Sequence, residues 1–132
     1  MKSKLFLVTM VLLLSTGSLC YSQEKRTTYW YAVSSSAKYE EYFVSNVLRS
    51  DYTGYSQTIS SDIQSQWTDH MKYELKHKGV EDYFKYTFNV LGPYNTYEDA
   101  EIARKKSLAN PPYNYMPYKM TNFNYVDIKN EE

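Results

Sequence analysis

Alternation of apolar and polar side chains is clearest between Tyr83 and Leu91, and it predicts a half-buried strand there. One side of this strand would carry Phe84, Tyr86, Phe88 and Val90, and the other would carry Tyr83, Lys85, Thr87 and Asn89. Gly92 and Pro93 are expected to end the strand, because glycine permits a sharp change of direction and proline has no N–H to donate.

The residues after this turn predict a helix that runs to about Leu108. Asn95 or Thr96 would cap its first turn, with an acidic residue three positions further on to complete a capping box. Acidic side chains dominate the first turn and basic ones the last turns, as the helix macrodipole favours.

Two other segments have apolar residues at helical spacing. The segment 37–49 is one, and its apolar face would be Tyr39, Phe43, Val44, Val47 and Leu48. The segment 62–78 is the other, with a capping box at Ser61 and Gln64 and a stop at Gly79. Its apolar stripe would be Ile63, Trp67, Met71 and Leu75. Both helices should pack on a sheet.

The remaining strands are predicted at 27–33, 55–59 and 118–128, and a Pro/Tyr/Asn loop at 111–117. The resulting order is β-α-β-α-β-α-β. We therefore expect an α+β fold in which an antiparallel sheet carries the helices.

The N-terminus has the pattern of a secretory signal peptide. Lys2 and Lys4 precede the apolar run LFLVTMVLLL, and small and polar residues follow as far as Ser22. This run is about half the length of a membrane-spanning helix, so we expect removal after Ser22, with Cys20 as the alternative cleavage site. The mature chain would then comprise a short arm (23–26), a single domain (27–128) and a C-terminal tail (129–132), exported to the periplasm or the extracellular space.

Composition narrows the possible functions of this mature chain. Lys+Arg and Asp+Glu stand at 15 each, and loss of Lys2 and Lys4 with the leader leaves a net charge of −2. A nucleic-acid-binding domain would show a basic surplus. Cys20 is the single cysteine and would leave with the leader, so no disulfide is expected. The 16 tyrosines should lie mostly between the core and water, because each buried hydroxyl needs a hydrogen-bond partner.

The string FNVLGPYNTYEDAEIARKKSL, within residues 86–108, resembles the second half of a SPOR domain, a small sporulation-related repeat of bacterial envelope proteins. The shared features are a strand, a Gly-Pro-aromatic turn and a capped helix with an acidic-Ala-acidic start. The resemblance implies a ferredoxin-like βαββαβ sandwich in which the helix 62–78 is an insertion. It also implies binding of peptidoglycan glycan strands on the open face of the sheet.

Catalytic and metal-binding patterns are weak in this sequence. His70, Glu74 and His77 would lie on one side of a helix, but two histidines seven residues apart are poor ligands for a single zinc ion. The sequence has no serine-hydrolase motif, no phosphate-binding glycine loop and no nucleophilic cysteine. We therefore predict a non-enzymatic protein without a metal or cofactor.

Two surfaces could bind a ligand. The first is the open sheet face, where Tyr83, Lys85 and Thr87 would point away from the helices. Aligning the strand 27–33 with the strand 83–91 places Trp30 on that face as well. The alternative is that the helix 62–78 covers this face and makes Trp30 part of the core.

The second surface is the loop carrying Tyr113, Tyr115 and Tyr118, since tyrosine is enriched at interfaces. The alternative here is that the loop only covers the end of the sheet. These surfaces lead to the prediction of an exported binding domain for cell-wall glycan. The alternative function is that of a protein–protein interaction module in an envelope or secretion assembly.

Overall fold

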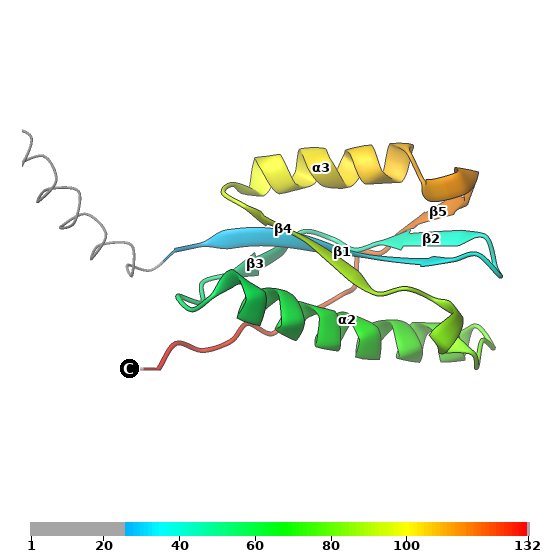
Figure 1. Cartoon of the computed structure of the whole chain (residues 1–132), viewed down its shortest axis with the longest axis horizontal. Helices are drawn as coiled ribbons and strands as arrows, with labels where there is room; N and C mark the ends of the chain where they lie inside the picture. Colours follow the sequence, from blue (N-terminus) through cyan, green and yellow to red (C-terminus); the bar gives the residue numbers. More distant parts are fainter. Residues whose placement is uncertain (1–25, 132) are drawn as a thin grey trace, which may run out of the picture.

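The computed structural model describes residues 26–131, so the expected leader lies outside the described residues. The strands are β1 (Thr28–Ser36), β2 (Glu41–Val44), β3 (Leu48–Ser50), β4 (Asn89–Tyr94) and β5 (Met116–Lys119) (Figure 1). The α-helices of this part are α2 (Ser56–His77) and α3 (Tyr97–Ala109), and two short 3-10 helices are η2 (Tyr83–Lys85) and η3 (Pro112–Asn114). The prediction of an α+β fold is confirmed.

The five strands form one mixed sheet with β1 at its centre. β2 and β3 follow each other along one edge of β1, and β4 lies along the other edge, all antiparallel to β1. β5 pairs with β2 in parallel, so the expectation of a wholly antiparallel sheet is wrong. The outer strands β4 and β5 each contain a proline, Pro93 and Pro117.

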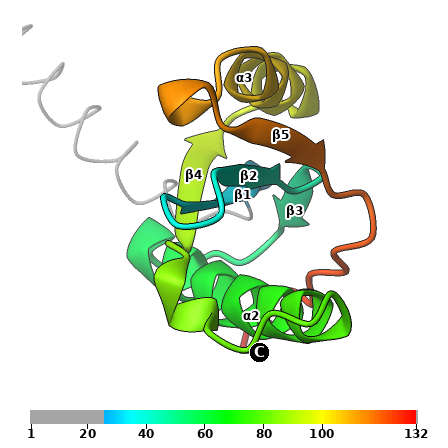
Figure 2. The same ribbon diagram turned by 90° about the vertical axis from the view of Figure 1, so that its right-hand side faces the viewer.

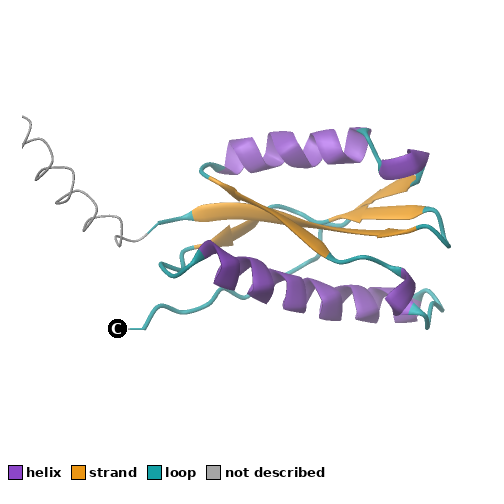
Figure 3. Cartoon of the chain, viewed as in Figure 1, coloured by secondary structure: helices purple, strands orange, loops and turns teal. Residues whose placement is uncertain are grey.

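The two helices lie on opposite faces of this sheet (Figures 1 and 2). Trp30 and Ala32 of β1 belong to the core cluster under α2, whereas Tyr31 and Val33 belong to the cluster under α3. Figure 3 shows the resulting three layers of helix, sheet and helix. Because both faces of β1 are covered, its burial does not follow the alternation of a half-buried strand.

The predicted stripe on α2 is confirmed. Its buried side chains are Ile59, Ile63, Trp67, Met71 and Leu75. Gly79 ends the helix as expected, at φ 82°, and the N–H of Val80 donates to the Leu75 carbonyl over 2.9 Å. The helix begins at Ser56, however, so the strand at 55–59 and the Ser61 capping box are wrong. Ile59 extends the stripe by one turn, which favours helix over strand.

The predicted helix at 37–49 is wrong, because this segment forms a tight turn followed by β2 and β3. Tyr42 and Val44 pack toward α3 while Phe43 packs toward α2, and burial on both faces removes the alternation that identifies a strand in a sequence. The expected order is therefore wrong in its first helix: the described residues run β-β-β-α-β-α-β.

The predicted strand at 83–91 is wrong over its first half. Residues 83–85 form η2, and β4 begins only at Asn89 and continues through Gly92 and Pro93. Tyr86 turns inward to donate from its hydroxyl to Glu41 over 2.8 Å, while Thr87 is held by the Ser35 carbonyl. The capped helix is confirmed, because the Thr96 hydroxyl accepts from the Asp99 N–H at the start of α3.

The predicted strand at 118–128 is also mostly wrong, since β5 ends at Lys119. The chain beyond it crosses to α2 and runs along that helix (Figure 2). Its backbone is bound by side-chain amides: Asn46 pairs with both the N–H and the C=O of Phe123, and Gln66 does the same with Val126. These amides take the place of a neighbouring strand.

Candidate functional site

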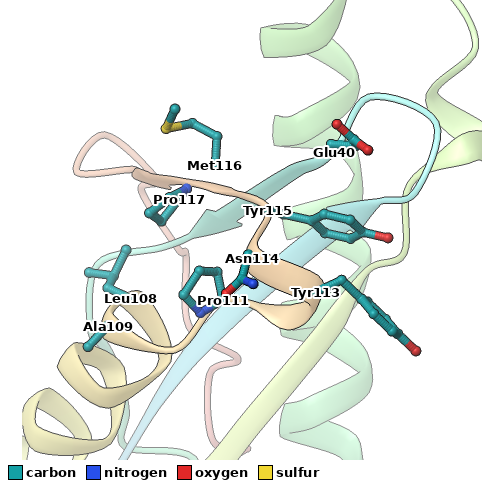
Figure 4. A pocket seen from close by; sticks show the side chains of 9 residues that line it. All are labelled: Glu40, Leu108, Ala109, Pro111, Tyr113, Asn114, Tyr115, Met116 and Pro117. Carbon is teal, nitrogen blue, oxygen red and sulfur yellow. The ribbon is translucent and has the colours of Figure 1, made fainter.

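A pocket of about 570 Å³ lies at one end of the sheet, where η3 and β5 meet the turn between β1 and β2 (Figure 4). Small-molecule sites typically have volumes of about 300–1,000 Å³. The lining residues are Glu40, Leu108, Ala109, Pro111, Tyr113, Asn114, Tyr115, Met116 and Pro117. The pocket therefore joins the end of α3, the proline-rich loop and the β1–β2 turn.

The loop's path follows from its sequence. Asn110 ends α3, its N–H donating to the Lys106 carbonyl, and Pro111 cannot continue a helix because it has no N–H. A tight turn follows, closed by the Tyr115 N–H donating to the Pro112 carbonyl over 3.0 Å. The Met116 N–H then donates to the Glu40 carbonyl over 2.9 Å, which joins the loop to the β1–β2 turn.

Three residues of the pocket have a left-handed backbone. Glu40, Tyr113 and Asn114 have φ values of 53°, 52° and 58°, and they are the non-glycine residues with positive φ among residues 26–131. Asparagine tolerates this region, but for other side chains it costs about 1–3 kcal/mol. Strain of this kind clusters at functional sites. All of it in the described chain converges on this one pocket.

The two tyrosine rings of the pocket differ in how they are held. Tyr115 is half-buried and packs against the cluster of Tyr31, Val33, Tyr42 and Val44 under α3. Tyr113 is 88% exposed, so burial gives no compensation for its strained backbone. The ring centroids lie 5.6 Å apart at an interplanar angle of 40°. A fixed ring and an exposed ring thus form one aromatic surface.

The β1–β2 turn is held from its other side by Asp82. The Asp82 carboxylate accepts from Lys38 Nζ and from the Tyr39 hydroxyl, each over 2.6 Å. The bond from Lys38, followed by that from Tyr39, lowers the pKa of Asp82, and the same carboxylate raises the pKa of Lys38. With Lys38 and Tyr39 bound to Asp82, Glu40 is left at the pocket side of the turn (Figure 4).

The expected placement of Trp30 on an open sheet face is wrong. Trp30 is 2% exposed and lies in one core cluster with the α2 stripe, so the helix covers this face. Its indole N–H donates to the Thr28 hydroxyl over 2.9 Å. Gly92 lies directly against the ring, where an added Cβ would be 2.6 Å from Trp30 Cε3. The alternative interpretation, in which Trp30 is core, is confirmed.

Tyr83, Lys85 and Thr87 are exposed but do not form a sheet face with Trp30. Tyr83 and Lys85 lie in η2, and the Thr87 hydroxyl lies 3.0 Å from that of Ser35. Tyr83 borders a smaller hollow of about 310 Å³ beside α2, where Lys72 Nζ lies 4.4 Å above its ring. The six candidate residues are therefore not brought together: Trp30 lies in the core, Tyr83 in this hollow, Tyr113 and Tyr115 in the pocket, and Lys85 and Thr87 elsewhere on the surface.

The sequence patterns do not indicate that Glu40 lines a pocket, because they predict a helix at 37–49. A signal was available in Tyr42-Phe43-Val44, three consecutive strand-forming residues after a polar run. A hairpin at this point would have brought Glu40 to its turn. Asn114 and Met116 lie within the predicted Pro/Tyr/Asn loop, but only the fold shows that they line a pocket.

The chemistry available in the pocket is that of recognition. Glu40 is its one carboxylate, so no second acid lies in its lining for acid–base catalysis. Residues 26–131 contain no group of three His, Cys, Asp or Glu side chains arranged to hold a metal ion. The candidate zinc residues are used elsewhere: His70 packs on Trp67 and Phe123, and Glu74 accepts from Asn122.

Comparisons of the chain with protein-family models, with curated proteins and with solved structures found no match. Within residues 26–131, neither α-helix is long and apolar enough to cross a membrane.

Proposed function

We propose that this chain is an exported, non-catalytic domain that binds glycan in the pocket formed by Tyr113, Tyr115 and Glu40. The observation that carries this proposal is the convergence of three left-handed residues on a pocket whose outer ring, Tyr113, is 88% exposed. A strained loop that presents an unburied aromatic ring has no evident structural benefit. Such strain is typical of binding sites.

The side chains of the pocket suit a sugar. A tyrosine ring offers an apolar face against which the C–H face of a sugar can pack, and its hydroxyl can hydrogen-bond. The Glu40 carboxylate and the Asn114 amide supply an acceptor and a donor for sugar hydroxyls at the same opening. The lining contains several such groups, which favours a sugar ligand over a purely apolar one.

Cell-wall peptidoglycan is the glycan we propose, in the periplasm or at the outer surface. Support comes from the predicted leader at 1–22 and from the SPOR-like stretch 86–108. The resemblance to the ferredoxin-like SPOR architecture is part of the same proposal. The site itself differs from that implied by the resemblance: α2 and α3 cover the two sheet faces, so the glycan would bind at the end of the sheet.

Binding to purified peptidoglycan sacculi tests the proposal. Tyr113→Ala should reduce retention about tenfold, as loss of a central aromatic contact does. Tyr55→Ala is the matched control, since Tyr55 is 84% exposed and does not line the pocket. Retention that is equal for Tyr113→Ala and the native chain, or that is absent for the native chain, would exclude glycan binding at this pocket.

A protein partner is the second candidate, because exposed apolar side chains continue from the pocket onto β5. Met116, which lines the pocket, is 60% exposed, and Tyr118, two residues further along β5, is 38% exposed. A photo-crosslinking residue at position 113 in cells distinguishes the two functions. One protein adduct of defined mass favours the protein partner, and adducts confined to cell-wall material favour glycan.

A further inference from the structure

We infer that the pocket selects a sugar bearing a protonated amine, which would bind between the Glu40 carboxylate and the rings of Tyr115 and Tyr113. This inference deepens the proposed function and rests on it. It names the feature of the glycan that the pocket recognises, namely a cationic amino sugar as opposed to a neutral or N-acetylated one.

Three side chains of the pocket project in the same direction. Figure 4 shows the Glu40 carboxylate and the rings of Tyr115 and Tyr113 projecting to the same side of the pocket, with Leu108 and Ala109 on the opposite side. The backbone is left-handed at both Glu40 and Tyr113. The backbone is therefore strained at two of the three residues whose side chains point this way.

The charge of Glu40 is not neutralised by the residues around it. Among residues 26–131 the Glu40 carboxylate has no hydrogen bond or ion pair, and no lysine or arginine lines the pocket. The nearest cation in the turn is Lys38, but Asp82 holds its Nζ at 2.6 Å on the other side. The turn therefore contains a lysine and does not use it to neutralise Glu40. The pocket keeps a net negative charge.

An ammonium group is the ligand chemistry that suits two aromatic rings beside a carboxylate. The faces of aromatic rings carry negative potential and attract cations, and ammonium groups close to such rings are bound more tightly when a carboxylate lies beside them. A ligand with only hydroxyl groups would desolvate Glu40 and return hydrogen bonds from neutral donors, with no opposite charge. An ammonium group returns a hydrogen bond between two opposite charges, which adds their Coulomb attraction. The arrangement therefore favours an ammonium group.

Titration of the protein with three soluble probes tests this inference: a tetramer of glucosamine, the same tetramer N-acetylated, and a short lysine-containing peptide with no sugar. Binding is followed by calorimetry at a pH that keeps the amines charged. The glucosamine tetramer should bind about tenfold more tightly than the acetylated one, and this preference should decrease with added salt.

Variants separate the charge from the rings. Glu40→Gln should remove the tenfold preference, so that the two tetramers bind with equal affinity. Glu40→Asn is the second variant, because asparagine tolerates the left-handed backbone. Tyr113→Ala should weaken both tetramers. Glu81→Gln, at an exposed carboxylate outside the pocket, should change neither.

The outcomes keep the inference and the proposed function distinguishable. Equal binding of the two tetramers by the native chain overturns amine selection and leaves glycan binding intact. Tighter binding of the peptide than of the glucosamine tetramer overturns the amino sugar as ligand. No binding of either tetramer overturns both. A preference that persists in Glu40→Gln and Glu40→Asn shows that Glu40 does not recognise the amine.

Discussion

The main-chain N–H of Met116 donates to the carbonyl of Glu40 over 2.9 Å, joining two residues that line the pocket. This bond begins the parallel pairing of β5 with β2, so the sheet itself fixes the distance between the proline-rich loop and the β1–β2 turn. The position of the pocket is therefore set by backbone pairing, whereas its character is set by exposed side chains. Side-chain substitutions can therefore change the chemistry of the pocket without changing its position.

Glu40→Gly tests the strain in the pocket. Glycine adopts a left-handed backbone without strain, which should raise the free energy of unfolding by about 1–2 kcal/mol. Glycine also has more freedom in the unfolded chain, which should lower the free energy of unfolding by roughly 0.5–1 kcal/mol. We expect the free energy of unfolding to rise by about 0.5 kcal/mol while amine selection is lost. Urea denaturation measures the first effect. A fall in stability would show that Glu40 is not strained.

Arg104→Met should be strongly destabilising. Arg104 is 3% exposed, its Nε donates to the Ser45 carbonyl between β2 and β3, and its Nη1 pairs with Glu101 over 3.0 Å. Methionine fills similar space but leaves a buried carbonyl unpaired and Glu101 without its cation, at a cost of about 2–3 kcal/mol. Chemical denaturation gives the value.

Lys105→Met is the matched control for that variant, because Lys105 is the next residue of α3 and is exposed. Its free energy of unfolding should stay within about 0.5 kcal/mol of the native value. Equal losses for the two variants would mean that burial of Arg104 does not matter.

The two amide clamps on the C-terminal segment should differ in strength. Asn46 binds the backbone of Phe123, which is 5% exposed, so Asn46→Ala should lower the free energy of unfolding by about 2 kcal/mol. Gln66 binds the backbone of Val126, which is 66% exposed and can pair with water instead, so Gln66→Ala should cost less than about 1 kcal/mol.

Hydrogen exchange gives a residue-specific readout of the same clamps. In Gln66→Ala the amide of Val126 should lose its protection while that of Phe123 keeps it. Loss of protection at both amides in either single variant would show that the segment detaches as one unit.

Stability should fall as the pH rises above about 10, the ordinary pKa of tyrosine. Burial raises the pKa of Tyr94 to about 12, and burial together with the carboxylates of Glu41 and Asp62 raises the pKa values of Tyr86 and Tyr125. The unfolded chain then loses these protons at a lower pH than the folded chain does. The contribution of these three tyrosines to the free energy of unfolding is complete below pH 10. It is lost as the pH rises through their pKa values in the folded chain.

Thermal melting at several alkaline pH values measures this loss. Tyr125→Phe should reduce the dependence of the melting temperature on pH, because one raised pKa is removed. Tyr55→Phe, which removes an exposed hydroxyl, should leave it unchanged. An equal dependence in the native chain and in Tyr125→Phe would exclude Tyr125 as a contributor.

The helices that bury one face could be predicted from the sequence. The stripe from Ile63 to Leu75 and the Thr96 cap are local patterns, and both are confirmed. β2 could not be predicted in this way, because its neighbouring side chains are buried on opposite faces of the sheet. The extended segment after Lys119 has a strand-like pattern, but its backbone bonds to the side chains of Asn46 and Gln66. These partners are distant in the sequence, so no local pattern predicts them.

The candidate site was predictable in part for the same reason. Tyr113 and Tyr115 stand out because their loop contains three prolines and no helical or strand pattern. The prediction that Trp30 lies on the surface is wrong, because the position of α2 over the sheet depends on packing between distant segments. Glu40 reaches the pocket only through the β1–β2 turn and the pairing of β5 with β2.

The C-terminal segment is held mainly through its backbone, so its attachment depends little on the identity of its side chains. The amides of Asn46 and Gln66 bond to groups that every residue except proline possesses in full. Substitutions at Val126 therefore leave the attachment intact, provided that the new residue is not proline. Related chains can be expected to vary freely at such outward positions of the segment while retaining the two amides and an aromatic anchor at Phe123.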